Sequence, residues 1–439
     1  MNRSPHTSRT DLEHQQLSKL RALVRQLSAS NAFYRDRLKT AGLDDACTLA
    51  EFCERLPLTT KAEIVADQTA HPPYGTNLTF DLSRYSRFHQ TSGTTGTPLR
   101  WLDTAEDWSA MLGCWEQVFR AAKVTRDDRV CFTFSFGPFL GFWTAFEAAT
   151  RLGCLCLPGG GLSTIARLRL LRDNQATVLC CTPTYALRLA EVAQQESFDI
   201  ADLAVRLIIV AGEPGGSVPA TRQLIEQRWS TAADGDGVRV FDHHGMTEVG
   251  PVTYECPNRP GTLRIIESSY LAEVIDPKTL DPAEPGERGE LVLTTLDRVG
   301  SPLLRYRTGD LVQPIYLNDA DEPVGGGSGS GGLALEGGIL GRADDMVLVR
   351  GVNIYPAAVD QVIRSIEGVH EYRVEIDAST ALTRMAVILE AEDGVAARVD
   401  SALQQAFSMR VPVRTVEANT LPRFEMKARR WVHTHERAT

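Results

Sequence analysis

The feature that most constrains the fold is an alternation of short apolar runs and helical stretches between about residues 105 and 210. The runs RVCFTFSF, CLCLP, TVLCCTP and VRLIIVAGEP are predicted as strands, and the stretches between them carry apolar residues at helical spacing. Strands separated by helices usually pair in parallel, with helices packed on the faces of the sheet. The order therefore predicts an α/β fold whose ligand lies beside the carboxyl ends of the strands.

The pattern changes after about residue 262. TLRIIESSYLAEVID and GERGELVLTTL are strand-like, which indicates an antiparallel segment beside the main sheet, and the Gly/Ser run at 325–332 predicts a surface loop. The last part of the chain reads as a small α+β unit. We therefore predict a large N-terminal domain with mixed and parallel sheets flanked by helices (residues 1–341) and a small mobile C-terminal lid (residues 342–439).

Composition excludes several classes of protein. The chain has 439 residues, of which 43% are hydrophobic and 23% charged, and its net charge of −10 opposes nucleic-acid binding. The sequence shows neither a signal peptide nor an apolar stretch of membrane-spanning length, so we expect no membrane partner. The nine Cys residues include no pair of CxxC motifs, and reduced thiols are expected. These observations predict a cytoplasmic protein.

A Gly-rich loop, HQTSGTTGTPLRW, gives the first indication of chemistry. Successive backbone N–H groups in such a turn bind anions, and Ser and Thr hydroxyls add donors, although an ordinary polar loop has the same composition. The spacing is not that of the P-loop NTPases. Loops of this kind usually end with a Lys, and Thr97 stands there in this chain.

Three further stretches offer charged side chains. In DHHGMTEVGP, Glu248 could hold a Mg²⁺ that bridges nucleotide phosphates, or could belong to a helix start. In LRYRTGDLV, Asp310 is expected in a turn, either as a local cap or as an acceptor for a ribose diol. In LPRFEMKARRW, Lys427 is by itself no more than a solvated Lys.

Taken in order, these stretches resemble the adenylate-forming superfamily, and its phenylacetate–CoA ligase branch in particular. The resemblance is carried by TSGTTGTP, GEPGG, MTEVGP, ECPNRPG, GERGELVLTTL, LRYRTGDL, GRADDMVLVRGVNIYP and LPRFEMKARR, and it extends from about residue 15 to 432. Each motif is weak to moderate alone, but the ordered set makes a coincidence very unlikely.

The resemblance implies a role for each matched position. Catalysis falls on Lys427, Glu248 and Thr247, with Glu248 carrying Mg²⁺. Residues expected to bind the nucleotide are Ser92, Gly93, Thr94, Thr95, Gly96, Gly212, Glu213, Pro214, His244, Gly245, Asp310 and Arg342. Asp344 matches the hinge of the lid, and Arg350 and Gly351 match the tunnel for coenzyme A. The implied substrates are ATP, CoA and a carboxylic acid, which reacts through an acyl-adenylate with release of AMP and pyrophosphate.

Two departures from the family pattern produce predictions of their own. Arg100 is a candidate to replace the loop Lys that is absent at Thr97. Members of this branch often carry a structural zinc. In this chain Arg264 stands where a His ligand is expected and the Cys-x-Cys stretch is absent, so that Cys256 is the one expected ligand that remains. We predict no structural zinc.

The acyl pocket of the branch is implied to include the aromatic stretch FTFSFGPFLGFW. Phe136, Gly137, Phe142 and His243 are the candidate lining residues, and they favour an aryl or arylacetic acid, although core packing explains the aromatics equally well. Three functions remain open: a ligase that uses free CoA, an enzyme that loads a carrier protein, and a degenerate binding protein without turnover. Homodimers are common in the branch, and a dimer is possible here.

Overall fold

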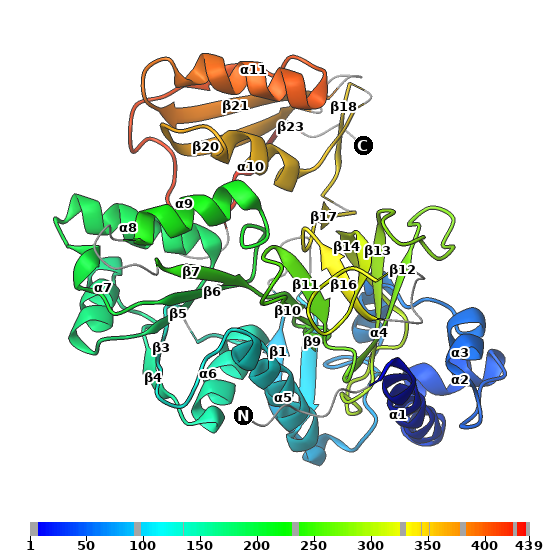
Figure 1. Cartoon of the computed structure of the whole chain (residues 1–439). Coiled ribbons are helices and arrows are strands. Elements are labelled where there is room, and N and C mark those ends of the chain that lie inside the picture. The colour runs from blue at the N-terminus through cyan, green and yellow to red at the C-terminus, as the bar shows by residue number, and fades with distance from the viewer. Residues whose placement is uncertain are drawn as a thin grey trace. The chain divides into compact units, whose positions relative to one another are not determined.

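The structure, a computed structural model, describes residues 8–91, 98–134, 136–230, 237–324, 331–343, 345–350, 352–377, 383–424 and 428–435. Contacts within the chain divide it into two compact units (Figure 1). One combines Met1–Gly161 with Asp242–Gly338, and the other combines Leu162–Phe241 with Ile339–Thr439. The predicted division at residues 341 and 342 stays a prediction.

The alternation of strands and helices is confirmed. The first unit contains α5 (Ala105–Ala121), β3 (Arg129–Phe132), α6 (Leu140–Leu152) and β4 (Leu155–Pro158), and β3 pairs in parallel with β4. The second contains α7 (Thr164–Asp173), β5 (Val178–Cys181), α8 (Pro183–Gln195), β6 (Leu207–Val210), α9 (Pro219–Trp229) and most of β7 (Arg239–Asp242). Parallel strands β5 and β6 are buried along their whole length, as their unbroken apolar sequences require.

Local signals explain where these helices begin and end. Thr182 caps α8 by accepting from the Tyr185 N–H, and Pro183 occupies the first helical position, where a missing N–H is tolerated. Helix α6 ends at Gly153, whose φ of +95° is left-handed.

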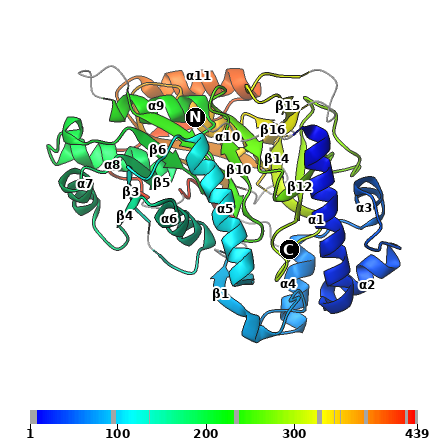
Figure 2. The same ribbon diagram turned by 60° about the horizontal axis from the view of Figure 1, so that its bottom comes forward.

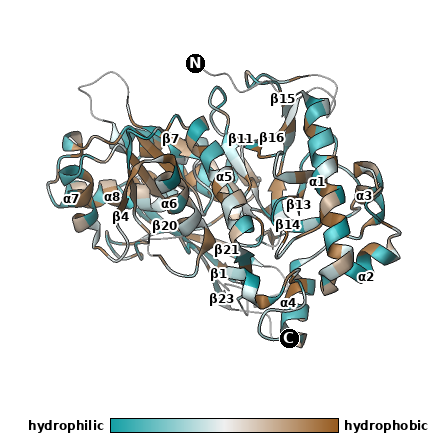
Figure 3. Cartoon of the chain, turned by 90° about the horizontal axis from the view of Figure 1, so that it is seen from below, coloured by the Kyte–Doolittle hydropathy of each residue, from teal (hydrophilic) through white to brown (hydrophobic). Residues whose placement is uncertain are grey.

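The N-terminal helical stretch is broken once. The helical region divides at Asn31 into α1 (Arg9–Ser30) and α2 (Ala32–Thr40), because the Asn31 side chain caps the second helix. Helices α3 (Leu49–Arg55) and α4 (Lys61–Ala70) follow, each with a capping box. Figure 2 shows α1 beside α2 and α3, and Figure 3 shows both hydrophilic and hydrophobic colour along α1 and α5.

Antiparallel sheets complete the first unit. Strands β1 (Tyr85–Gln90) and β2 (Arg100–Thr104) form a hairpin, as do β8 (Gly245–Met246) and β9 (Gly250–Pro251). Strands β12 (Tyr270–Ile275), β13 (Gly289–Thr295) and β14 (Tyr306–Val312) lie in one sheet. A second sheet has the order β10 (Thr253–Glu255), β11 (Thr262–Ile265), β16 (Gly332–Glu336) and β15 (Pro314–Leu317).

Two expectations about this region need correction. The stretch TLRIIESSYLAEVID is strand-like along its length, but it divides into β11 and β12, which belong to different sheets. Asp310 was expected in a turn, but it lies within β14, where inward-facing residues alternate with half-buried ones. Of the predicted Gly/Ser surface loop, residues 325–330 lie outside the described part, and Gly332 opens β16.

The C-terminal part has the predicted small α+β architecture. After β17 (Gly341–Arg342) come the hairpin β18 (Val347–Val349) and β19 (Val352–Ile354), α10 (Pro356–Arg364), and a sheet in the order β22 (Val413–Thr415), β21 (Arg384–Ala391), β20 (Val369–Asp377), β23 (Trp431–His435). Helix α11 (Val395–Phe407) packs on this sheet through Val395, Val399 and Leu403.

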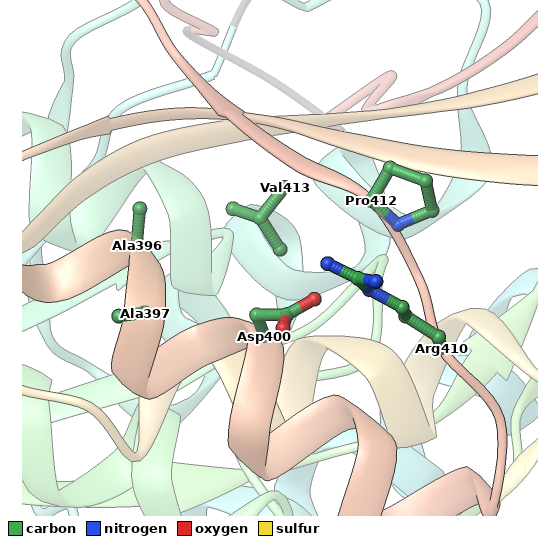
Figure 4. Close-up of a pocket in the computed structure, with 6 residues that line it drawn as sticks. All are labelled: Ala396, Ala397, Asp400, Arg410, Pro412 and Val413. Atoms are coloured by element: carbon green, nitrogen blue, oxygen red, sulfur yellow. The ribbon is translucent and has the colours of Figure 1, made fainter.

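A shallow groove opens beside α11. Figure 4 shows its lining residues, which are Ala396, Ala397, Asp400, Arg410, Pro412 and Val413 around a volume of about 490 Å³. Within the described residues no helix is long and apolar enough to cross a membrane.

Candidate active site

The predicted phosphate loop is closed at its neck by the β1–β2 hairpin. The Thr91 N–H donates to the Leu99 carbonyl at 3.0 Å, and the Leu99 N–H donates to Thr91 Oγ1 at 3.0 Å. Loop residues Ser92, Gly93, Thr94, Thr95, Gly96 and Thr97 lie outside the described part of the chain, as do Asp344, Gly351 and Lys427. The hairpin therefore fixes where the loop starts and ends.

The Thr-Glu motif lies on the small β8–β9 hairpin of the same unit. Gly245 is required there because an added Cβ would stand 2.8 Å from the Gly250 carbonyl oxygen. Thr247 is partly exposed, and Glu248 is buried. The backbone carbonyls of this pair have hydrogen-bond partners outside the hairpin.

Arg298 supplies these partners. Its Nη1 donates to the carbonyl oxygens of Thr247 at 2.9 Å and Glu248 at 2.8 Å, while its Nε and Nη2 donate to Asp103 at 2.6 and 2.9 Å. Burial disfavours the ionised form of Asp103, but Arg298 and His89 hold the pKa of this carboxyl below its ordinary value. A buried ion pair thus connects the hairpin that carries Glu248 to β2.

The Asp103–Arg298 ion pair also contacts strand β1, which leads into the phosphate loop. His89, one residue before the end of β1, has its Nδ1 3.5 Å from Asp103 Oδ2, and its ring stacks on Trp108 with centroids 5.2 Å apart. Sequence reasoning missed both Asp103 and Arg298. Neither lies in a recognisable motif, and only tertiary contact shows that they brace the two loops.

Lys61 is a second residue that sequence reasoning missed. Its Nζ lies 3.3 Å from Oε1 of Glu248, with the Lys side chain 45% exposed and the Glu side chain 6% exposed. Backbone bonds between Thr59 and the Arg305–Arg307 segment attach this region to β14. The capping box of α4 is visible in the sequence, but the proximity to Glu248 is not.

Arg100, by contrast, points to another partner. Its guanidinium Nη1 donates to the Pro73 carbonyl oxygen at 3.1 Å, and the Gln68 side chain contacts its backbone. Its candidacy as a replacement for the loop Lys stays a prediction, while Lys61 is the cation seen beside Glu248.

Two residues predicted to bind nucleotide meet in the first unit. Nε2 of His244 lies 3.0 Å from Oδ2 of Asp310, and the Asp side chain is almost completely buried. The His244 N–H donates to Thr253 Oγ1, which fixes the backbone at the start of the β8–β9 hairpin. The pair places an imidazole against the carboxylate expected to receive a ribose.

The remaining nucleotide and CoA positions lie in the second unit. Gly212, Glu213 and Pro214 follow β6, and both Glu213 oxygens accept backbone N–H groups, from Thr184 at 2.8 Å and from Ala428 at 2.7 Å. Arg342 ends β17, and Arg350 stands in the turn between β18 and β19 with a φ of +50°. Their nucleotide and CoA roles stay predictions.

The aromatic stretch forms a cluster of its own. Phe142 stacks on Phe134 with centroids 4.0 Å apart, and Phe136 contacts Trp143 and Phe146 at 4.8 and 5.3 Å. Gly137 is sterically restricted because an added Cβ would meet the Phe139 ring at 3.2 Å. Core packing therefore accounts for much of this stretch, and its pocket role stays a prediction.

His243 is a buried neutral base. Its Nδ1 lies 2.6 Å from the Thr253 carbonyl oxygen, so this nitrogen carries the proton, and its ring lies against Trp115 at 4.3 Å. Burial lowers the pKa of His243 to about 4. The tautomer leaves Nε2 as a hydrogen-bond acceptor at neutral pH.

An ion pair occupies the region where relatives were expected to hold zinc. Arg264 donates to Asp321 at 2.9 Å and to the Asn318 carbonyl at 2.7 Å, beside buried Cys256. Burial and the neighbouring Asp321 raise the pKa of the Cys256 thiol to about 12, which disfavours the thiolate. No group of three possible metal ligands occurs among the described residues, and the absence of zinc stays a prediction.

Comparison with known proteins identifies the family. The model of the AMP-binding enzyme family matches residues 88–296, and that of the AMP-binding enzyme C-terminal domain matches residues 351–435. Phenylacetate-coenzyme A ligase of Pseudomonas putida is 31% identical over 86% of this chain and 82% of its own length.

Solved structures agree with this result. A 2-hydroxyisobutyryl-CoA ligase in its postadenylation state with 2-HIB-AMP is 25% identical, with a TM-score of 0.88 over 98% of this chain and 90% of that chain. In its thioesterification state with 2-HIB-AMP and CoA, the TM-score is 0.69 over 97% of this chain and 90% of that chain, at 26% identity.

The chain belongs to the AMP-binding family of adenylate-forming enzymes, in its phenylacetate–CoA ligase branch. The predicted fold class, the resemblance and the enzyme class, an AMP-forming acid–thiol ligase with ATP and CoA as substrates, are confirmed by these comparisons.

Proposed function

We propose that this protein joins an aryl or arylacetic acid to coenzyme A through an acyl-adenylate. One observation carries the proposal for this chain: the structure gathers Glu248, Lys61, His244 and Asp310 in the unit that also holds the neck of the phosphate loop. A carboxylate with a neighbouring cation suits metal-bound phosphates, and a buried carboxylate with an imidazole suits a ribose diol. The relatives' names give the substrate class.

The proposed first step forms one bond and breaks another. A carboxylate oxygen of the acid attacks the α-phosphorus of ATP, and the bond to the bridging oxygen breaks to release pyrophosphate. Negative charge develops on the phosphoryl oxygens, where loop N–H groups, Lys61 and Lys427 would stabilise it. In the second step the thiol of CoA displaces AMP from the acyl carbon, which gives the thioester.

Magnesium fits the residues present. Glu248 offers a buried carboxylate and Thr247 a neighbouring hydroxyl, and Mg²⁺ is usually held by one or two carboxylates together with phosphate oxygens. When bound, it would neutralise phosphate charge. We propose Glu248 as its protein ligand. Lys61 would contribute the positive charge that a Lys at position 97 would otherwise provide.

The experiment is AMP release from Mg-ATP over a panel of aryl, arylacetic and short aliphatic acids, with and without CoA. AMP that rises with one acid class and CoA, together with the matching thioester, supports the ligase. Adenylate without transfer to CoA would favour a carrier protein as acceptor, and no AMP from any acid would favour a degenerate binding protein. The cytoplasmic location and the homodimer stay predictions.

A further inference from the structure

The residues before and after Lys427 are held by contacts to other parts of the second unit. Ahead of it, Arg423 donates to Glu191 of α8 at 3.2 Å and to buried Glu390 at 2.7 Å. After it, the Ala428 N–H donates to Glu213 at 2.7 Å. Ala428 is the residue that directly follows Lys427 in the sequence.

Arg430 adds a further attachment two residues later. It donates to Glu371 at 2.7 and 3.1 Å and to Thr184 Oγ1 at 3.4 Å. Burial disfavours ionised Glu371, but Arg364 and Arg430 hold the pKa of this carboxyl below its ordinary value. The segment therefore meets the start of α8 through Arg430 as well as through Glu213.

The carboxylate of Glu213 accepts hydrogen bonds from two separate segments of the chain. An ionised carboxylate only accepts hydrogen bonds, and it has two oxygens. One accepts from Thr184, in the first turn of α8, where the backbone N–H groups have no intrahelical partner, and the other accepts from Ala428. An amide in this position would present an NH₂ group to one of the two N–H donors.

We propose that Glu213 is a positioning residue that latches the Lys427 segment for adenylate formation and releases it before thioester formation. The proposal rests on the proposed function. It is assigned to the first step because Lys427, which directly precedes Ala428, is the residue proposed to stabilise charge during adenylate formation. A lid that alternates between two states needs contacts specific to each.

The test measures the two half-reactions separately in Glu213→Gln and Glu213→Ala. Adenylate formation is followed by ATP–pyrophosphate exchange, with the acid that gives the strongest exchange in the panel. Thioester formation is followed from chemically prepared acyl-adenylate and CoA. Since a hydrogen bond to a charged group is lost, we expect exchange to fall roughly ten-fold further than thioester formation.

The matched control is Glu226→Gln on α9. Its carboxylate also accepts a backbone N–H, from Val240 at 3.0 Å, but that partner lies outside the Lys427 segment. The control should leave the ratio of the two half-reactions unchanged. Thermal unfolding of each variant shows whether the fold is retained.

Two results would overturn the latch. Equal losses in both half-reactions would assign Glu213 a general structural role, and unchanged exchange in both variants would show that the contact is dispensable. A wild-type protein without exchange for any acid would instead refute the proposed function itself, so the two failures are distinguishable.

Discussion

Among single residues, Lys61 is a cation that tertiary contact brings to Glu248 and that no motif indicates. Its Nζ lies 3.3 Å from Glu248, although the two residues are far apart in the sequence. In the proposed function, this cation compensates phosphate charge in place of the Lys that is absent at position 97. The sequence located Glu248 by its motif but offered no such motif for Lys61.

We predict that Lys61→Ala weakens adenylate formation with little change in stability. The loss of a charge-assisted contact to phosphate should raise the KM for Mg-ATP roughly ten-fold, and Lys61→Arg should restore part of it. Exchange kinetics over a range of ATP concentrations measure this. Lys39→Ala on α2 is the control, and a KM equal to the wild-type value in Lys61→Ala would exclude the role.

His243 predicts a dependence of stability on pH. Its folded pKa of about 4 lies below the ordinary value near 6.5, so between these values the unfolded chain binds more protons than the native one. Stability should therefore be complete above about pH 6.5 and fall as the pH decreases toward 4, by up to about 1.4 kcal/mol per pH unit.

The measurement is urea unfolding at several pH values for the wild type and for His243→Asn. Asn keeps a donor for the Thr253 carbonyl but does not titrate. Below about pH 6.5, the slope of the unfolding free energy against pH should be smaller in the variant, by the amount that corresponds to about one bound proton. Parallel curves for the two proteins would contradict the assignment.

At the scale of elements, apolar periodicity and capping residues predicted most helices and strands. The alternation from α5 to β6 and the C-terminal α+β unit follow from residue patterns that act within a few positions. The division of the stretch at 262–276 into two strands was not predicted, because a pattern of apolar residues gives no information about which sheet a strand joins. Asp310 was misplaced in a turn because Gly309 beside it resembles a turn signal.

The Arg264–Asp321 ion pair provides a prediction about the β10-β11-β16-β15 sheet. Both side chains are mostly buried, with 12% and 5% exposed, so removing one charge leaves the other without compensation. We expect Arg264→Met to lower the free energy of unfolding by about 3 kcal/mol.

A double variant provides the control for this pair. Arg264→Met with Asp321→Asn removes both charges, and Asn tolerates the left-handed φ of +63° at this position, so the double variant should recover much of the stability, as measured by denaturant unfolding. Metal analysis of the purified wild type should find no stoichiometric zinc. Equal stability of the wild type and Arg264→Met would show that the pair contributes little.

For the whole molecule, ligand binding should be visible as stabilisation. A non-reactive sulfamoyl mimic of the acyl-adenylate binds only the native chain, so at a hundred times its Kd it should stabilise the protein by about 2.7 kcal/mol. The rise in unfolding temperature that the mimic produces should be much smaller in Asp310→Asn, because this variant weakens the proposed ribose contact. Asp276→Asn, in an exposed turn, is the control, and equal shifts in all three proteins would refute this role of Asp310.

The sequence by itself determined the family, the fold class and the candidate roles of Glu248 and Asp310. This was possible because short motifs and local periodicity depend on neighbouring residues, which the sequence displays directly. The order of the motifs, more than any one of them, identified the enzyme class.

Only the tertiary structure decided which distant side chains serve those motifs. Arg298 and Asp103 brace the Thr247–Glu248 hairpin, Lys61 approaches Glu248, and Glu213 joins α8 to the Lys427 segment. Each contact joins residues separated by many positions. A Lys or Arg outside a motif has the same local sequence signal whether it is solvated or paired, and the GEPGG motif does not show which distant residue Glu213 contacts. Their roles come from where the chain brings them together, which local pattern cannot specify.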